Sequence, residues 1–296
     1  MRILCYLPAV FAFDSALDTA QKKAGMRCVS KAFPVDNVHK TLAGPSIAYI
    51  SKKLVELQQD HGFRQMRNVR ESLSVKQYWI NLQLQRVLQT TSTTQIVILG
   101  AGFDTRAYYL PDLQGKHVFE VDLYEIVNLK NEIIGRNNFS SFCNVTRIAH
   151  DLNEYGVMHK LTEHGYDPEQ QTVFIAEGIQ ACLSHELHKT LLRLPLSNTG
   201  NTLIMDITSK NLKSDNCESM QSIGNGMNDP LKQLRRMGYT DIVIDQVGSE
   251  TANFGALDTE IPHFLTNHWG CKIPLRITEV DGVPIQRLFL IKAVSI

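Results

Sequence analysis

The feature that most constrains the fold of this chain is a series of short apolar segments, rich in β-branched residues, that alternate with helical patterns. The segments cover residues 95–100, 116–122, 144–152, 172–178, 201–207, 241–248 and 287–296. The first five each lead into a segment of helical character, which is typical of a parallel sheet covered on both faces. The last two are joined without a helical crossover. We therefore predict a doubly wound α/β fold with seven mostly parallel strands and an antiparallel edge strand.

The residues before the first of these strands have a helical pattern. Apolar residues in the segment 74–89 recur at positions i, i+3, i+4 and i+7 of one helix face, and Ser74 is the expected N-cap. A second amphipathic helix is expected between Pro45 and Gly62. Another is expected after the fourth strand, with Ser184 as its N-cap.

These patterns divide the chain into two regions. We predict an N-terminal helical cap over residues 1–94 and an α/β domain over 95–296, in which the polar segment 208–230 is an insertion of lid-like length. The apolar N-terminal run ILCYLPAVFAF is too short to span a bilayer. We expect it to be an arm packed on the domain, with a signal peptide as the alternative, and we expect no membrane partner.

Composition limits the class of partner and the compartment. The 30 basic and 30 acidic residues cancel, so no nucleic-acid partner is expected. The six cysteines are scattered and show no zinc-ligand spacing, which favours reduced thiols and a cytoplasmic location. They are Cys5, Cys28, Cys143, Cys182, Cys217 and Cys271. We predict no metal site, and nothing in the sequence indicates an oligomeric state.

A glycine-containing turn follows the first predicted strand, in the sequence VILGAGFDTRAYYL. Gly100 and Gly102 match the first two glycines of the dinucleotide-binding pattern G-x-G-x-x-G, but Thr105 replaces the third. Asp104 puts a carboxylate where a dinucleotide would bring its pyrophosphate, and like charges repel. A nucleoside with a cationic centre and no phosphate avoids this conflict, which favours S-adenosylmethionine. The alternative is that Asp104 only caps the next helix.

Acidic residues mark the ends of the next three predicted strands. Asp122 lies twenty residues beyond Gly102, the separation at which an acid reaches ribose hydroxyls. Asp151–Leu152 and Glu177–Gly178 follow the third and fourth strands. Ligands of doubly wound sheets bind at the carboxyl ends of the strands. We therefore expect the ribose at Asp122 and the adenine at Asp151 and Leu152.

The same residues resemble a known family. The runs VILGAGFDTRAYYL, FEVDLYEIVNLK, HDL and FIAEGIQACLSHE are similar to those of leucine carboxyl methyltransferase-like proteins, a group of class I S-adenosyl-L-methionine-dependent methyltransferases. The resemblance covers roughly residues 19 to 210. It implies a Rossmann-like fold and S-adenosyl-L-methionine as the cofactor. The group includes protein-phosphatase carboxyl methyltransferases, a tRNA wybutosine-pathway member and bacterial O-methyltransferases that tailor polyketides.

The resemblance also implies the residues that bind the cofactor. They are Gly100, Gly102 and Glu177 for the methionine end, Asp122 with Leu123 beside it for the ribose, and Asp151 and Leu152 for the adenine.

Two arginines are implied as partners of the cofactor's carboxylate, which a guanidinium can hold in a bidentate pair. They are Arg27, which follows the pair Thr19–Ala20, and Arg70. The chain departs from the family pattern at Asp36–Asn37, where proline usually follows the aspartate, and in the residues around Arg70. The helical cap, which shapes the acceptor pocket, is therefore the part to which the resemblance transfers least.

Together these features predict an O-methyltransferase that acts on a hydroxyl or carboxyl oxygen of a small-molecule or peptide-like acceptor. A polyketide or peptide natural product, and so secondary metabolite biosynthesis, is favoured by analogy with the bacterial members. The alternatives are a protein C-terminal leucine carboxyl methyltransferase and a non-catalytic cofactor-binding module. An NAD(P) oxidoreductase is disfavoured by the turn.

The catalytic residues are not predicted. A hydroxyl acceptor profits from a general base, whereas a carboxylate needs only positioning. His185 and Asp206 are the two candidates for the base. The alternative is a purely structural role for each: His185 as a helix-start residue and Asp206 as a cap or a local hydrogen-bond partner.

Overall fold

The computed structural model describes residues 15–29, 35–58, 63–208, 226–227, 229–247, 279–280, 283–284 and 288–296, with side chains left out at 53–72, 181, 208 and 279–284. The apolar N-terminal run, most of the predicted 208–230 insertion and the side chain of Arg70 lie outside this description. Within the described ranges, no helix is both long enough and apolar enough to cross a bilayer.

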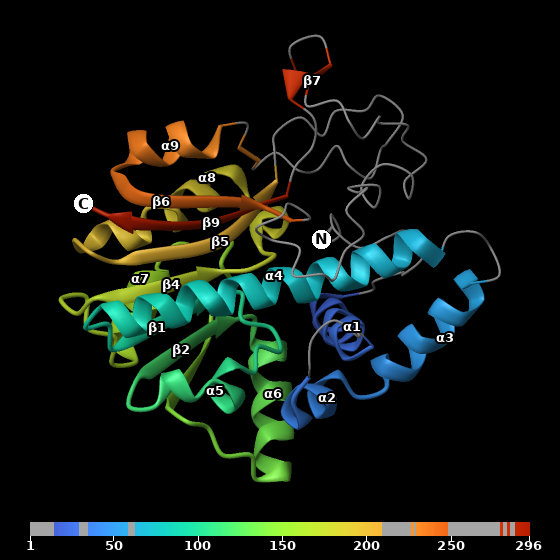
Figure 1. Cartoon of the computed structure of the whole chain (residues 1–296). Coiled ribbons are helices and arrows are strands. Elements are labelled where there is room, and N and C mark those ends of the chain that lie inside the picture. Colours follow the sequence, from blue (N-terminus) through green and yellow to red (C-terminus); the bar gives the residue numbers. More distant parts are fainter. Residues whose placement is uncertain are drawn as a thin grey trace.

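A seven-stranded sheet forms the centre of the molecule (Figure 1). Its order is β3-β2-β1-β4-β5-β9-β6, and β1 to β5 run parallel. The strands are β1 (Gln95–Leu99), β2 (His117–Asp122), β3 (Asn144–Ala149), β4 (Thr172–Ala176), β5 (Thr202–Thr208), β6 (Tyr239–Gln246) and β9 (Leu288–Ser295). All seven predicted strands are therefore present. Two short strands, β7 (Glu279–Val280) and β8 (Val283–Pro284), pair with each other.

The predicted antiparallel edge is confirmed, with β9 as the reversed strand. β9 pairs antiparallel with β5 on one side and with β6 on the other, so β6 is outermost. Most of β9 is buried, whereas β6 is fully buried only at Tyr239. An apolar strand needs cover on both sides, so the more polar β6 takes the exposed edge although it comes earlier in the chain.

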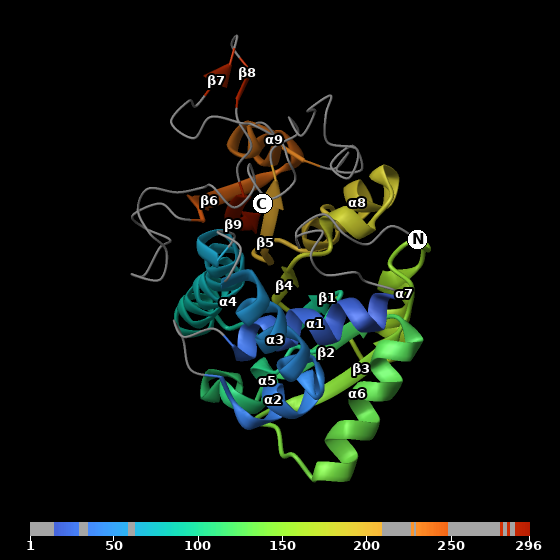
Figure 2. The same ribbon diagram turned by 90° about the vertical axis from the view of Figure 1, so that its right-hand side faces the viewer.

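The helices are α1 (Ala16–Cys28), α2 (Asn37–Ala43), α3 (Ser46–Gln58), α4 (Phe63–Thr90), α5 (Arg106–Tyr109), α6 (Tyr124–Asn137), α7 (Val157–Glu163), α8 (His185–Leu191) and α9 (Pro230–Met237). Three 3-10 turns join them, η1 (Pro111–Leu113), η2 (Gln180–Cys182) and η3 (Leu194–Ser197). Helices α1, α2 and α3 gather at the end of the sheet where the parallel strands finish, and Figure 2 looks onto this end with α1 lying across it.

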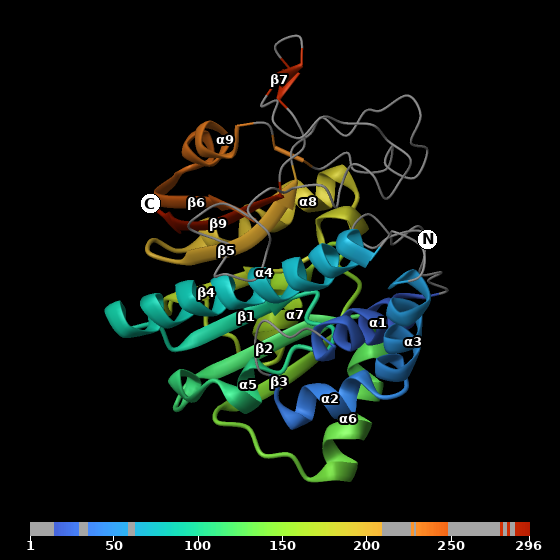
Figure 3. The same ribbon diagram turned by 45° about the vertical axis from the view of Figure 1, so that its right-hand side comes forward.

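Both faces of the sheet are covered, as its apolar strands require. On one face, α4 lies along the sheet (Figure 3). Its Leu84 belongs to a core with Ile96 and Ile98. On the other face, α7, α8 and α9 contribute to a core that contains Val97 and Leu99. Successive side chains of a strand point to opposite faces, so alternate residues of β1 enter different cores. This two-sided burial explains why the segment is apolar at nearly every position.

Two of the three predicted helix starts are confirmed. α3 begins directly after Pro45, and Ser184 caps α8 by accepting a hydrogen bond from Leu187 N at 3.4 Å. The prediction for Ser74 is wrong. α4 begins at Phe63, and Ser74 lies buried inside it at 6% exposure. Apolar residues of the predicted segment, from Val75 onward, pack in the core with the strands, so the pattern located a contact with the sheet rather than the start of the helix.

We expect replacement of Leu84 by alanine to lower the free energy of unfolding by about 2–5 kcal/mol, because the lost contacts leave a cavity between α4 and the sheet. Leu84 is 0% exposed. The matched control is Leu231→Ala in α9, where leucine is 37% exposed and a change within about 0.5 kcal/mol is expected. Urea unfolding measures both, and equal losses would show that α4 is not anchored through Leu84.

Candidate functional site

A cavity of about 250 Å³ lies at the carboxyl ends of β1 to β4, under α1. It is slightly smaller than the range typical of small-molecule sites, roughly 300–1,000 Å³. Eight of the nine residues predicted to bind a cofactor line it: Arg27, Gly100, Gly102, Asp122, Leu123, Asp151, Leu152 and Glu177. The ninth, Arg70, belongs to α4, and its side chain lies outside the described residues. Residues far apart in the chain therefore meet at one site.

Glycine is required at position 100 for two separate reasons. Its φ of +64° is in the left-handed region, which other residues rarely adopt. In addition, a Cβ on Gly100 would lie 2.1 Å from Cγ2 of Ile179, a residue that lines the cavity. The backbone at position 100 therefore lies closer to the side chain of Ile179 than a residue with a Cβ would allow.

Asp122 has a fixed orientation at the end of β2. Its Oδ2 accepts a hydrogen bond from Gly102 N at 2.6 Å and its Oδ1 accepts one from Leu123 N at 2.7 Å. Burial raises the pKa of Asp122, and these two N–H groups act against that shift. Each carboxylate oxygen has further acceptor capacity beyond these bonds, so the side chain can also accept hydrogen bonds from ligand hydroxyls.

Asp104 differs from the prediction, because its charge is already paired. Its Oδ1 accepts a hydrogen bond from Arg106 N at 2.8 Å, and its Oδ2 forms an ion pair with the Arg106 guanidinium. The N-cap of α5 is Thr105, so Asp104 is not the capping residue of the alternative prediction, although its side chain does bind the first N–H of the helix. Repulsion by a free carboxylate is therefore not what disfavours phosphate here. Instead, Asp104 occupies the first N–H of α5, and α5 has only four residues to generate a macrodipole.

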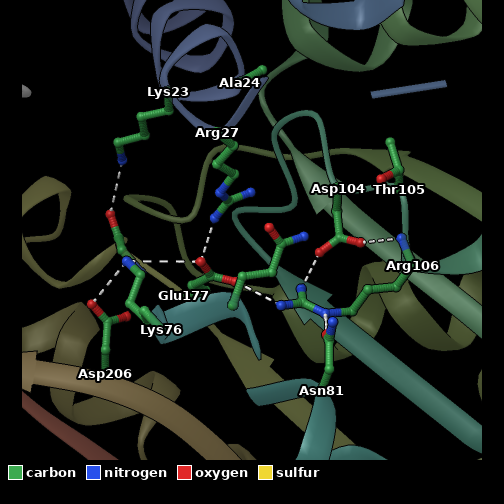
Figure 4. Close-up of polar contacts among 12 residues, drawn as sticks. Lys23, Ala24, Arg27, Lys76, Asn81, Asp104, Thr105, Arg106, Glu177 and Asp206 are labelled. Carbon is green, nitrogen blue, oxygen red and sulfur yellow. Dashed lines mark hydrogen bonds and ion pairs between the residues drawn. The ribbon is translucent and has the colours of Figure 1, made fainter. Parts of the chain in front are cut away.

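A buried ion-pair network connects the cap to the sheet through Glu177 (Figure 4). Its Oε1 pairs with Arg27 of α1, and its Oε2 accepts from Arg106 Nη2 at 2.8 Å. Lys76 Nζ of α4 lies 3.8 Å from Oε1. Burial alone would raise the pKa of Glu177, but the three cations outweigh it and hold that pKa well below its ordinary value. Glu177 is therefore ionised.

A second ion pair fixes the turn after Glu177. Asp206 Oδ1 accepts from Gly178 N at 2.6 Å, and Asp206 Oδ2 accepts from Lys76 Nζ at 3.2 Å. Asp206 is thus held by local bonds and does not line the cavity. His185 is exposed at the start of α8 and does not line it either. The geometry supports neither residue as the general base.

Several residues of the site were missed from sequence. Lys23 lines the cavity and Arg106 completes the network, while His150 lines the cavity with a buried Nε2 that has no hydrogen-bond partner among the described residues. The spacing of Thr19, Lys23 and Arg27 by four positions puts all three on one face of α1. That period could have identified Lys23. No comparable signal marks His150.

The described residues contain no group of three or more histidine, cysteine or acidic side chains that could hold a metal ion. In the same part of the chain Cys28 and Cys143 are free thiols. Cys5, Cys217 and Cys271 lie outside the description.

The strand order reverses between β1 and β4, and the cavity lies at the carboxyl ends of these strands. This arrangement defines a Rossmann-like α/β protein. Solved structures of similar fold include a DUF574 family protein from Streptomyces avermitilis, with 12% identity, a TM-score of 0.51 and coverage of 94% of this chain and 97% of that one. A provisionally named methyltransferase from Thermobifida fusca YX has 12% identity, a TM-score of 0.50 and 94% coverage of both chains.

Sequence comparison then identifies the family. The model of the leucine carboxyl methyltransferase family matches residues 16–194, and the chain belongs to this family.

Two curated relatives are provisionally named S-adenosyl-L-methionine-dependent methyltransferases. The one from Parafrankia sp. is 31% identical over 131 residues, which is 44% of this chain and 42% of the relative. The one from Mycolicibacterium vanbaalenii is 36% identical over 120 residues, 40% of each chain. The matched region thus spans less than half of either relative.

We expect Gly100→Ala to destabilise the protein more than Gly115→Ala. Both glycines have positive φ, +64° and +74°, but a Cβ at position 115 meets nothing within 4 Å. Gly115→Ala should therefore report backbone strain alone, about 1–2 kcal/mol. The contact with Ile179 should add about 1–3 kcal/mol at position 100. Urea unfolding of both variants tests this, and equal losses would mean that Ile179 moves aside freely.

Proposed function

We propose that this chain is an S-adenosyl-L-methionine-dependent O-methyltransferase that transfers a methyl group to a hydroxyl or carboxyl oxygen of a polyketide or peptide natural product. The observation that carries the proposal is the convergence of Gly100, Asp122, Asp151 and Glu177 on one cavity beneath Arg27. Membership of the leucine carboxyl methyltransferase family supports it. We also propose a cytoplasmic location, which the free thiols of Cys28 and Cys143 support.

The residues of the cavity fit this cofactor. Asp122 has acceptor capacity left for two ribose hydroxyls, and Leu152 offers an apolar contact for the adenine. Arg27 has a buried Nε without a hydrogen-bond partner among the described residues, which a carboxylate would satisfy. Glu177 is ionised and can accept hydrogen bonds from an ammonium group. The carboxylate and the ammonium of the methionine end thus each have a partner of opposite charge.

When bound, the cofactor supplies a methyl carbon activated by its sulfonium. The chain has to hold the acceptor oxygen in line with this carbon and to keep water away. Asp122 would hold the ribose, Arg27 and Glu177 would hold the methionine end, and α1 covers the cavity. Because the sulfonium is already reactive, positioning accounts for most of what the protein has to provide.

A specific observation also favours the second candidate, a protein C-terminal leucine carboxyl methyltransferase. The family that matches residues 16–194 is the one described by that activity. A binding module without turnover is the third candidate, since the same residues would hold the cofactor in it. An NAD(P) oxidoreductase is disfavoured because a pyrophosphate would have to displace Asp104 from the first N–H of α5.

We expect Asp122→Ala to weaken the binding of S-adenosylhomocysteine by at least about tenfold, equivalent to 1.4 kcal/mol, because the ribose loses its acceptor. The control is Asp112→Ala in η1, which removes a partner of Gln85 outside the cavity and should leave affinity unchanged. Titration calorimetry measures both variants, with NADH as a ligand that should not bind. Unchanged affinity in Asp122→Ala would mean that the ribose assignment is wrong.

A methyl-labelled cofactor identifies the acceptor class. The wild-type chain is incubated with hydroxylated metabolites, with carboxylated metabolites and with peptides that end in leucine, and each labelled product is treated with mild base. A methyl ester releases methanol under these conditions, whereas a methyl ether does not. Label only on leucine peptides would favour the second candidate, and binding without any labelled product would favour the third.

A further inference from the structure

The buried network around Glu177 contains four basic side chains, and three of them are paired with acids. Arg106 pairs with Asp104, Arg27 with Glu177, and Lys76 with Asp206. The fourth is Lys23, whose Nζ donates a hydrogen bond to Gly178 O at 3.4 Å (Figure 4). Within the described ranges, Lys23 forms no ion pair with a carboxylate.

Lys23 lines the cavity of the proposed cofactor. It extends from α1 into the cofactor cavity, and its Nζ reaches the turn that follows Glu177. Gly178 and Ile179 of that turn also line the cavity. Among the described residues, Lys23 is the one lysine that lines the cavity, one helical turn from Arg27 on the same face of α1. It lies beside the proposed methionine site and forms no ion pair with a described carboxylate.

The surroundings of Lys23 favour its neutral form. Burial is the main cause that lowers the pKa of Lys23 below its ordinary value, and the nearby cations Lys76 and Arg27 add to this effect. Cys182 and Asp206 act in the opposite direction. The titratable and charged groups around Nζ are Arg27 of α1, Lys76 of α4, Asp122 after β2, Glu177 after β4, Cys182 of η2 and Asp206 of β5.

We propose that Lys23 is the general base of the methyl transfer and that the acceptor group is therefore an un-ionised hydroxyl. This inference rests on the function proposed above. The acceptor oxygen forms a bond to the methyl carbon while the carbon–sulfur bond breaks and its electron pair stays on sulfur. The hydroxyl proton passes to Nζ of Lys23, which becomes an ammonium and later releases the proton to solvent.

Charge balance in a buried site supports this assignment. Before the step, the positive charge is on sulfur and Lys23 is neutral; after it, sulfur is neutral and Lys23 is charged. The net charge of the cavity is therefore unchanged, which matters where solvent screens poorly. A carboxylate acceptor would need no base and would instead stabilise a charged Lys23.

The first test compares Lys23→Met with Lys23→Arg. Methionine keeps the length and apolar volume of the side chain, while arginine keeps the charge but cannot accept a proton at ordinary pH. Both variants should lower kcat/KM by at least about 100-fold. Affinity for S-adenosylhomocysteine should stay within about threefold of wild type, which shows that the cavity is intact. The matched control is Lys22→Met, one position earlier, where the ammonium pairs with Asp18 at 2.7 Å.

The pH profile gives the sign of the effect. In the wild type, kcat/KM should rise with pH as Lys23 loses its proton and then level off, because only the neutral amine accepts the hydroxyl proton. Lys23→Met should lack this rise. Activity retained in Lys23→Arg would overturn the proposal in favour of a permanent cation that holds an anionic acceptor. Activity retained in Lys23→Met would overturn any role in transfer.

A binding measurement tests the same group without turnover. A charged Lys23 repels the sulfonium of S-adenosylmethionine but not the neutral sulfur of S-adenosylhomocysteine. The affinity for the first relative to the second should therefore rise with pH, by at least about threefold in the wild type, and stay constant in Lys23→Met. A constant ratio in the wild type would overturn the proposal.

The outcomes separate this inference from the proposed function. If the wild type binds neither nucleoside, the proposed function fails. If it binds them and forms a base-labile methyl ester, O-methylation stands but the hydroxyl acceptor and the role of Lys23 as base are wrong. A base-stable ether whose formation depends on Lys23 is the expected result.

Discussion

The buried carboxylate of Glu177 is the group on which the site depends. It directly follows β4, is only 8% exposed, and is held by Arg27 from α1 and Arg106 from the start of α5. A carboxylate buried to this degree has to be paired, because an isolated buried charge costs several kcal/mol. Since its two partners come from the cap and from the turn after β1, this one side chain holds three parts of the chain around the same cavity.

The same network determines which ligand suits the cavity. Asp104 already accepts the first N–H of α5, so a phosphate would have to compete with the protein's own carboxylate. A methionine nucleoside brings an ammonium and a carboxylate, each able to pair with a group that is already ionised and oriented. Lys23 lines the same cavity but bonds to the backbone oxygen of Gly178 and forms no ion pair with a described carboxylate.

Sequence patterns pointed to residues that line the cavity where those residues follow a strand. Gly100, Asp122 and Glu177 each come directly after an apolar run, and parallel strands bring their carboxyl ends to one edge. The patterns failed where a residue's role depends on its partner. Asp104 was expected to act through free charge, yet Arg106, two positions away, neutralises it. Ser74 was expected to be an N-cap, yet the helix begins at Phe63, eleven residues earlier.

By itself the sequence determined the seven strands, the nature of the turn after β1 and the line of acids at the strand ends, because these depend on local period and on spacing along the chain. Only the tertiary structure decided that β9 lies inside β6, that Asp206 pairs with Lys76, and that Lys23 lines the cavity without an ion pair to a described carboxylate. These features depend on which residues meet across long stretches of chain, as in the 130 positions between Lys76 and Asp206. Burial and charge pairing select such contacts, and neither is a property of a single segment.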